Sequence, residues 1–305
     1  MALHRLTSIT IGVPDVARTG AYYAEFGLTA KGEDRFATAD GGEQLRLVHA
    51  PRRRLIELGI GADDRDDIGR IGASLDRLGI AVDRASERIT AVDPGTGVRV
   101  LVSVAERLHQ PPIAAASSNG PGRTDRRTDR AAAVRRTERV RPRKLGHVVL
   151  GTTELDASQR FFIDGVGFKV SDTVAGLASF LRCSTDHHNL LVQPAPVQLL
   201  HHTSWQVDDV DEIGRGARAL LEADPSRHVW GLGRHHIGSN FFWYLRDPAG
   251  NFTEYYADLD CILDDQLWKP GVWDGPNSLY SWGPPPPPSF LAPDDLAELM
   301  AGMHA

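Results

Sequence analysis

The sequence has little cysteine, no long apolar run and only a small net charge. Two cysteines, Cys183 and Cys261, exclude a disulfide framework, and no Cys-x-x-Cys pair is present to hold zinc. No stretch approaches the roughly 18 apolar residues that a membrane-spanning helix needs. The first residues, MALHRLTSITIGV, lack the pattern of a secretory signal peptide. We therefore expect a cytoplasmic protein without a membrane partner.

Composition and charge place the chain among ordinary globular proteins. Its 305 residues are 41% hydrophobic and 24% charged, which suits two domains of about 100–200 residues each. Thirty-four basic residues stand against 40 acidic ones, for a net charge of -6. Nucleic-acid-binding domains usually carry a basic face. We therefore expect no nucleic-acid partner.

Residues 110–144 differ in composition from the rest of the chain and separate two halves. Between Arg123 and Lys144, nine Arg and one Lys stand against three acidic residues. Such a run could be a patch for an anionic surface or a solvated linker. The segment has few large apolar residues with which to form a core, and this favours the linker.

The same pattern recurs on both sides of this linker. Three pairs of segments align, namely 6–28 with 145–168, 56–70 with 201–215, and 90–97 with 244–250. Each unit begins with a short β-rich run, followed by turn residues and an amphipathic helix, and Asp-Pro-x-Gly marks a hairpin turn before the last strand. The pattern predicts two tandem α+β modules, over residues 1–109 and 145–260.

The two halves differ in the side chains that can do chemistry. Eight of the twelve histidines lie between His147 and His236, and all six tryptophans lie at or beyond Trp205. Three candidate ligand positions of the second half hold other residues in the first. The alignment places Ser8 opposite His147, Glu57 opposite His202, and Val100 or Leu101 opposite Glu254. We therefore expect a first module without a metal site.

Three expected strands of the second half can bring metal ligands together. Side chains two apart share a face of a strand, so His147 lies on the face of Val149, His202 on that of Ser204, and Glu254 on that of Tyr256. Two imidazoles and one carboxylate on neighbouring strands can converge on one ion. This ligand set is typical of non-heme Fe(II) oxygenases, although zinc also accepts such ligands.

Three motifs make the resemblance to a family specific. The segments GHVVL, HHTSWQV and GRHHIGSNFFWYLRDPAGNFTEYY resemble the metal-binding domain of type I extradiol ring-cleaving dioxygenases, which are vicinal-oxygen-chelate proteins. The resemblance spans nearly the whole chain. It implies tandem βαβββ modules that form two barrel-like domains, and a homo-oligomer. It also implies Fe(II) or Mn(II), O2 as co-substrate, and ring cleavage of a catechol.

The resemblance also assigns roles to residues. It implies His147, His202 and Glu254 as metal ligands and His187 as the acid/base, with the neighbouring His188 as the alternative. Tyr244 and His235 would bind the substrate oxygens. The expected substrate-lining residues are His201, Val149 and Asn189. Gly238 departs from the family, because some members carry an acidic residue at that position.

The composition of the last segment allows two interpretations. Residues 261–305 hold three tryptophans and five successive prolines, typical of a polyproline segment for a partner or of a stiff arm packed over the pocket mouth. We predict the arm, ending in a short helix.

The apolar Val149 suggests a hydrophobic catechol. The alternatives are a glyoxalase-type metal-dependent isomerase and a non-catalytic small-molecule binding protein of the same fold.

Overall fold

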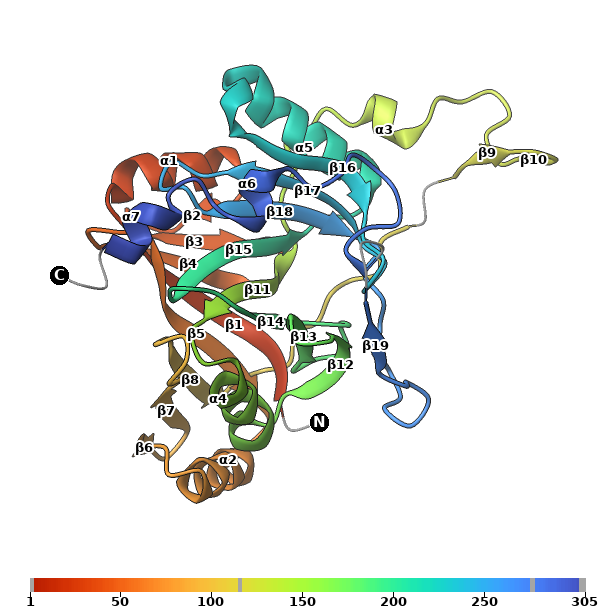
Figure 1. Cartoon of the computed structure of the whole chain (residues 1–305). Coiled ribbons are helices and arrows are strands. Elements are labelled where there is room, and N and C mark those ends of the chain that lie inside the picture. Colours follow the sequence, from red (N-terminus) through yellow and green to blue (C-terminus); the bar gives the residue numbers. More distant parts are fainter. Residues whose placement is uncertain (1–2, 115–116, 275–277, 302–305) are drawn as a thin grey trace.

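Two mixed β-sheets, one in each half of the chain, form the framework of the computed structural model, which describes residues 3–114, 117–274 and 278–301 (Figure 1). The elements of the first half are β1 (Leu3–Val13), α1 (Val16–Glu25), β2 (Thr29–Ala30), β3 (Arg35–Thr38), β4 (Gly42–His49), β5 (Arg54–Ala62), α2 (Arg65–Arg77), β6 (Val82–Ala85), β7 (Arg88–Val92) and β8 (Arg99–Val104). The strand order is β2-β3-β4-β1-β5-β8-β7-β6.

The second half repeats this topology. Its elements are β11 (Lys144–Thr152), α4 (Leu155–Arg160), a π-helical turn η1 (Phe161–Val166), β12 (Lys169–Val174), β13 (Ala178–Arg182), β14 (Leu190–Pro194), β15 (Leu199–Gln206), α5 (Val210–Ala223), a 3-10 turn η2 (Pro225–Arg227), β16 (His228–Arg234), β17 (Phe241–Arg246) and β18 (Phe252–Ala257). The sheet order β12-β13-β14-β11-β15-β18-β17-β16 matches that of the first half strand by strand. The predicted α+β fold with tandem βαβββ units is confirmed.

Local sequence signals explain where the helices begin. Asp15, Asp64 and Asp209 each precede a helix, and each carboxylate accepts a hydrogen bond from the backbone N–H three residues later. The amphipathic helix expected after the first β-rich run of the second half forms as α4 and η1, with Phe161 and Phe162 buried.

The strand register decides a correspondence that the sequence left open. In the second sheet, Ser204 of β15 pairs with both His147 and Glu254. In the first sheet, Gly59 of β5 pairs with Ser8 and Leu101. Leu101, not Val100, therefore corresponds to Glu254.

The two halves share one apolar core. The ring of Phe26, just after α1, stacks on Tyr255 of β18 with centroids 3.9 Å apart. Gln44 of β4 accepts a hydrogen bond from the backbone N–H of Leu145 at 2.8 Å. These contacts hold the sheet of the first half against the sheet of the second.

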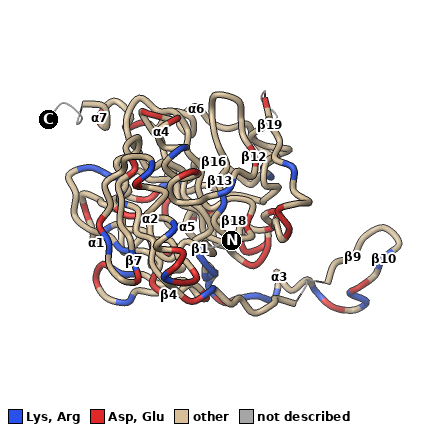
Figure 2. The backbone as a smooth tube through the Cα atoms, turned by 90° about the horizontal axis from the view of Figure 1, so that it is seen from below, with Lys and Arg blue, Asp and Glu red and all other residues tan. Residues whose placement is uncertain are grey.

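The segment between the halves projects from the body of the molecule (Figures 1 and 2). It contains β9 (Asn119–Gly120), β10 (Arg123–Thr124) and α3 (Ala132–Arg135). Further along, Arg136 forms an ion pair with Asp209, and Arg143 forms ion pairs with Asp208 and Asp40. Part of the basic charge of this segment is therefore neutralised against acidic residues of both modules.

The C-terminal arm lies against the second module. It contains β19 (Gly271–Trp273), which pairs with β12, and the short helices α6 (Pro288–Leu291) and α7 (Leu296–Ala301). The indole N–H of Trp230 donates to the carbonyl of Pro284 at 2.7 Å, and Phe290 is buried. The predicted final helix corresponds to α7, and its end at residues 302–304 lies outside the described residues. Among the described helices, none has both the length and the apolar character to span a membrane.

Candidate metal centre

Three adjacent strands bring together the three side chains expected to bind a metal. His147 lies on β11, His202 on β15 and Glu254 on β18, and β15 lies between the other two strands. All three side chains are buried, and one potential ligand atom from each lies within 4.8 Å of the others. The Nε2 atoms of His147 and His202 lie 3.0 Å and 3.7 Å from Oε2 of Glu254.

The unsatisfied polar atoms of this cluster fit a bound cation. Nε2 of His202 and Oε2 of Glu254 are buried without a hydrogen-bond partner; although His147 lies close to Oε2, its approach lacks hydrogen-bond geometry. Oε1 of Glu254 accepts a hydrogen bond from Nδ2 of Asn240 at 3.1 Å. Burying polar atoms without partners is costly. A divalent ion among these three side chains would give the free atoms a partner.

The electrostatics of the cluster favour the protonation states that bind metals. Burial alone would raise the pKa of the Glu254 carboxyl, but His147 and His235 beside it bring that pKa below its usual value. Burial, reinforced by the neighbouring histidines, lowers the pKa of His202 well below its usual value. A carboxylate and a neutral imidazole are the forms that coordinate metals.

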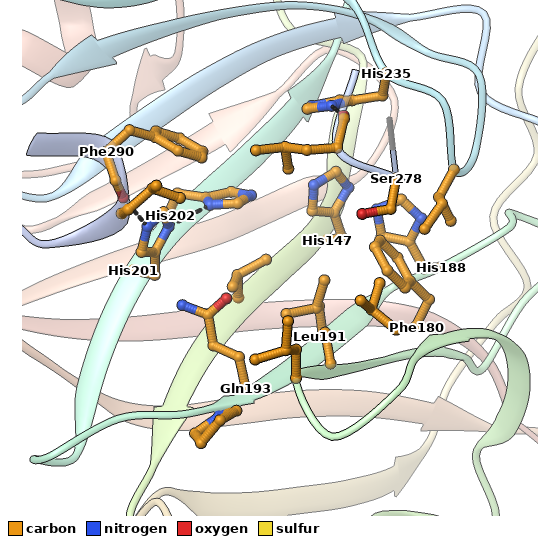
Figure 3. A pocket seen from close by; sticks show the side chains of 18 of the residues that line it. His147, Phe180, His188, Leu191, Gln193, His201, His202, His235, Ser278 and Phe290 are labelled. Carbon is orange, nitrogen blue, oxygen red and sulfur yellow. Dashed lines mark hydrogen bonds between the residues drawn. The ribbon is translucent and has the colours of Figure 1, made fainter. Parts of the chain in front are cut away.

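A cavity of about 340 Å³ opens beside the cluster (Figure 3). One end is lined by histidines and a tyrosine: His147, His188, His201, His202, His235 and Tyr244. The remaining wall is mostly apolar: Val149, Val174, Leu177, Ala178, Phe180, Leu191, Pro194, Ile237, Leu279, Phe290 and Leu291, with Gln193 and Ser278. Among the described residues, the lining includes no Lys, Arg, Asp or Glu.

The structure places His188, the alternative that the sequence offered, in the cavity, and not His187. The imidazole of His188 lies 4.3 Å from that of His147, centroid to centroid. His187 is turned away, with its Nε2 3.0 Å from Oδ2 of Asp172. Alternation of faces does not apply to this pair of histidines, because residues 183–189 form bends and a bridge rather than a continuous strand.

Asn189 also does not line the cavity, contrary to expectation. Its Oδ1 accepts hydrogen bonds from the backbone N–H of Cys183 and the hydroxyl of Ser184, at 2.9 and 3.0 Å. Its Nδ2 donates to the carbonyl of Gly146 at 3.0 Å. Asn189 therefore holds the bend that carries His188, while Val149 and His201 lie in the lining as expected.

Tyr244 and His235 form a hydrogen-bonded pair at the metal end of the cavity. The hydroxyl of Tyr244 lies 2.9 Å from Nε2 of His235, and Nδ1 of His235 lies 2.7 Å from the carbonyl of Leu279. Because that carbonyl can only accept, Nδ1 of His235 carries the proton and Nε2 accepts from the phenol. Burial raises the pKa of Tyr244 well above its usual value, so the phenol stays protonated.

Three residues near the centre have roles that the sequence did not reveal. Asn240 holds the carboxylate of Glu254, and Phe290 reaches the cavity from the distant arm. Gly238 has a φ of +82°, and a Cβ there would lie 3.2 Å from Cε1 of His188. A side chain at Gly238 would therefore crowd the ring of His188. Asn240 lies within the GSN motif, which was the available signal, whereas no local pattern distinguishes Phe290.

The first module lacks the corresponding donors. Ser8, Glu57 and Leu101 occupy the equivalent positions, and Glu57 forms an ion pair with Arg99 at 2.5 Å. Within the part of the chain that the structure describes, the only group of three or more potential ligands is the one in the second module.

Known proteins resemble this chain in sequence and in fold. The model of the Glyoxalase/Bleomycin resistance protein/Dioxygenase superfamily matches residues 144–255. A protein named Metapyrocatechase 2, from Cupriavidus necator, is 32% identical over 95% of this chain and 92% of its own. A protein named Manganese-dependent 2,3-dihydroxybiphenyl 1,2-dioxygenase, from Geobacillus genomosp. 3, is 29% identical over 44% of this chain and 45% of its own.

A solved structure extends the likeness across both modules. The crystal structure of the Mn(II)-bound glyoxalase from Novosphingobium aromaticivorans superimposes with a TM-score of 0.74 at 26% identity, covering 94% of this chain and 93% of that one. Full-length similarity to the metapyrocatechase, with the superfamily match over the second module, identifies the relationship. The chain belongs to the extradiol catechol dioxygenases of the glyoxalase/bleomycin resistance protein/dioxygenase superfamily.

Proposed function

We propose that this chain cleaves a neutral catechol with an apolar substituent, using O2 and a divalent metal ion held by His147, His202 and Glu254. The main observation behind this proposal is that two imidazoles and one carboxylate lie together, buried, beside an apolar cavity, and that Nε2 of His202 and Oε2 of Glu254 have no hydrogen-bond partner. When bound, the ion would supply open coordination positions that hold the diol and O2 together and would lower the pKa of the catechol hydroxyls.

The reaction is balanced without a further reductant. The ring carbon–carbon bond beside the diol breaks, both oxygen atoms of O2 enter the product, and the catechol itself supplies the electrons. The hydroxyl protons of the catechol must leave as it binds, and a proton must return during ring opening. Histidine is the usual side chain for such transfers near neutral pH.

His188 is the residue placed to move these protons. Its ring lies in the cavity beside His147, and burial together with the neighbouring histidines lowers its pKa well below the usual value. It is therefore neutral before the substrate enters and able to accept a proton. The Tyr244–His235 pair, at the same end of the cavity, would hydrogen-bond a substrate oxygen.

The cavity favours an uncharged substrate. A carboxylate in this apolar lining would be buried without a cation to pair with it, at a cost of several kcal/mol. A cavity of about 340 Å³ lies within the size range of pockets for drug-sized ligands and leaves room beyond a single ring. An aryl- or alkyl-substituted catechol fits this chemistry.

Iron is the metal we propose, with manganese as the alternative. The two-histidine, one-carboxylate set with open positions is typical of non-heme Fe(II) oxygenases. The relative from Geobacillus is named as manganese-dependent, and the same ligand types suit either ion.

A metal-dependent isomerase is the second candidate, favoured by the likeness to the Mn(II)-bound glyoxalase. Such an enzyme consumes no oxygen. Among the described residues, the candidate ligand group contains three side chains, without the fourth protein ligand expected for an isomerase. Oxygen uptake therefore separates the two functions directly.

The test is anaerobic loading of the whole chain with Fe(II) or Mn(II), followed by catechols in air. The panel is 3-methylcatechol, 2,3-dihydroxybiphenyl and the acid 3,4-dihydroxyphenylacetate, followed by visible absorbance and oxygen uptake. We expect a yellow product with one O2 consumed per catechol, and a preference for the neutral substrates. Metal binding without oxygen uptake would contradict the dioxygenase and favour the isomerase, whereas turnover of the acid alone would overturn the substrate class.

A further inference from the structure

One buried arginine of the first module joins the C-terminal arm to the second module. Arg53, before β5, is 4% exposed and binds Asp295 of the arm with two hydrogen bonds, Nε to Oδ2 at 2.6 Å and Nη2 to Oδ1 at 2.8 Å. Its Nη1 donates to the carbonyl of Leu200 on β15 at 2.7 Å. The guanidinium of Arg53 therefore binds both the arm and β15, the strand that carries the proposed metal ligand His202.

A direct hydrogen bond also joins the arm to β15, next to the candidate metal centre. The carbonyl of Phe290, five residues before Asp295, lies 2.6 Å from Nε2 of His201 (Figure 3). Nδ1 of His201 lies 2.8 Å from Nδ1 of His202. The ring of Phe290 packs against Tyr244, with centroids 4.7 Å apart.

These contacts determine which nitrogen of each ring carries a proton. A carbonyl can only accept, so Nε2 of His201 donates to Phe290. A neutral His201 then has an acceptor at Nδ1, and Nδ1 of His202 must donate to it. This leaves the lone pair of His202 on Nε2, the buried atom without a hydrogen-bond partner that lies 3.7 Å from Glu254.

We propose that Arg53 and the C-terminal arm are positioning elements of the metal centre. The Arg53–Asp295 pair holds the carbonyl of Phe290 against His201, and His201 holds the ring of His202 with its free nitrogen toward the metal. The inference rests on the proposed function in that His202 is taken as a ligand. It gives the first module, which holds Ser8, Glu57 and Leu101 at the three equivalent positions, a role in metal binding. Partners that orient metal-binding histidines strengthen metal affinity about 10- to 100-fold.

The neighbouring carboxylate offers a matched control. Asp294 pairs with Arg246 at 2.7 Å, and the side chain of Asp294 is exposed while that of Arg246 is partly buried. Asp294→Asn and Asp295→Asn make the same chemical change one residue apart on the same arm. Asp295→Glu keeps the charge. His201→Phe removes the hydrogen bonds of His201 to Phe290 and His202 and keeps an aromatic ring.

The experiment measures metal binding by the whole chain without catechol. Free Mn(II) is quantified by electron paramagnetic resonance to give Kd, and Fe(II) release to a chelator is timed without oxygen. We expect His201→Phe to raise the Kd for Mn(II) about 10-fold or more, and Asp295→Asn to raise it about threefold or more. Asp294→Asn should stay within about twofold of the parent, and Asp295→Glu should recover part of the loss. The Tm of each metal-free variant is recorded alongside.

The outcomes separate this inference from the proposed function. Equal Kd values for Asp295→Asn and Asp294→Asn, with the parent chain binding metal, would overturn the role of the arm and leave the ligand assignment intact. A loss of metal affinity that merely follows the Tm across all four variants would overturn it as well. A parent chain that binds neither ion would instead contradict the proposed function.

Discussion

Nδ1 of His187 lies 3.1 Å from Nδ1 of His188, and Nε2 of the same His187 lies 3.0 Å from Oδ2 of Asp172. The carboxylate accepts, so a neutral His187 carries its proton on Nε2 and accepts at Nδ1. His188 must then donate from Nδ1, which leaves its Nε2 as the basic nitrogen. The histidine outside the cavity thus orients the one inside it.

His188→Gln should lower turnover of 2,3-dihydroxybiphenyl about 100-fold or more and leave metal content unchanged. Glutamine keeps hydrogen-bonding capacity but cannot carry a proton between reactants, and general acid–base catalysis contributes about 10²–10⁴-fold. Oxygen uptake and metal analysis on the same preparations measure both effects. Unchanged turnover would remove His188 from the reaction.

His187→Gln should have a smaller effect than His188→Gln, because His187 acts through its hydrogen bond to His188. Asp172→Asn should lower turnover about as much as His187→Gln does. An asparagine amide can donate as well as accept, so His187 would no longer have to carry its proton on Nε2. The pH profile of kcat separates the two roles: variation at Asp172 should shift the profile, and loss of His188 should flatten it. A larger loss at His187 than at His188 would restore His187 as the acid/base.

Glu254→Ala should abolish stoichiometric metal binding, and Glu57→Ala should not. The two carboxylates lie in related modules, but Glu254 is buried beside His147 and His202, whereas Glu57 pairs with Arg99. Metal content after dialysis against Fe(II) or Mn(II), with the Tm as a check on folding, measures the contrast. Retained metal in Glu254→Ala would contradict the ligand assignment.

Leu191→Phe should raise KM more for a large catechol than for a small one. Leu191 of β14 pairs with Val149 and lines the apolar wall of the cavity, so a larger ring there takes up space that a substituent would occupy. We expect KM for 2,3-dihydroxybiphenyl to rise about 10-fold and KM for catechol to change less, because overpacking costs about 1–3 kcal/mol. Leu267→Phe, on an exposed leucine, is the matched control. Equal changes for both substrates would contradict this placement of the substituent.

Asp247 should make the free energy of unfolding pH-dependent. Burial raises its pKa to about 6, despite hydrogen bonds from Asn251 that favour the charged form. Because the folded-state pKa lies above the unfolded value of 3.8, the folded chain binds more protons between these values, and stability gained from Asp247 grows as pH falls through 6. Relative to Asp247→Asn, the parent chain should gain about 1 kcal/mol between pH 7.5 and pH 5. Urea unfolding of both proteins at these pH values measures the difference, and a constant difference would contradict the raised pKa.

The repeat and the types of candidate ligand follow from local patterns in the sequence. The aligned segments gave two α+β modules because strand and helix periodicity and the turn residues around Pro248 are local properties. His147, His202 and Glu254 were predicted as a group because alternation along a regular strand assigns side chains to faces, and the structure brings these three side chains together.

The other residues of the candidate site come together through contacts between distant parts of the chain. His188 rather than His187 lies in the cavity because residues 183–189 leave the regular strand, where alternation no longer predicts direction. Phe290 and Arg53 meet β15 across 89 and 147 residues of sequence, through single hydrogen bonds. Contacts of that kind leave no periodic trace in the sequence, since they depend on where packing places each carbonyl and guanidinium.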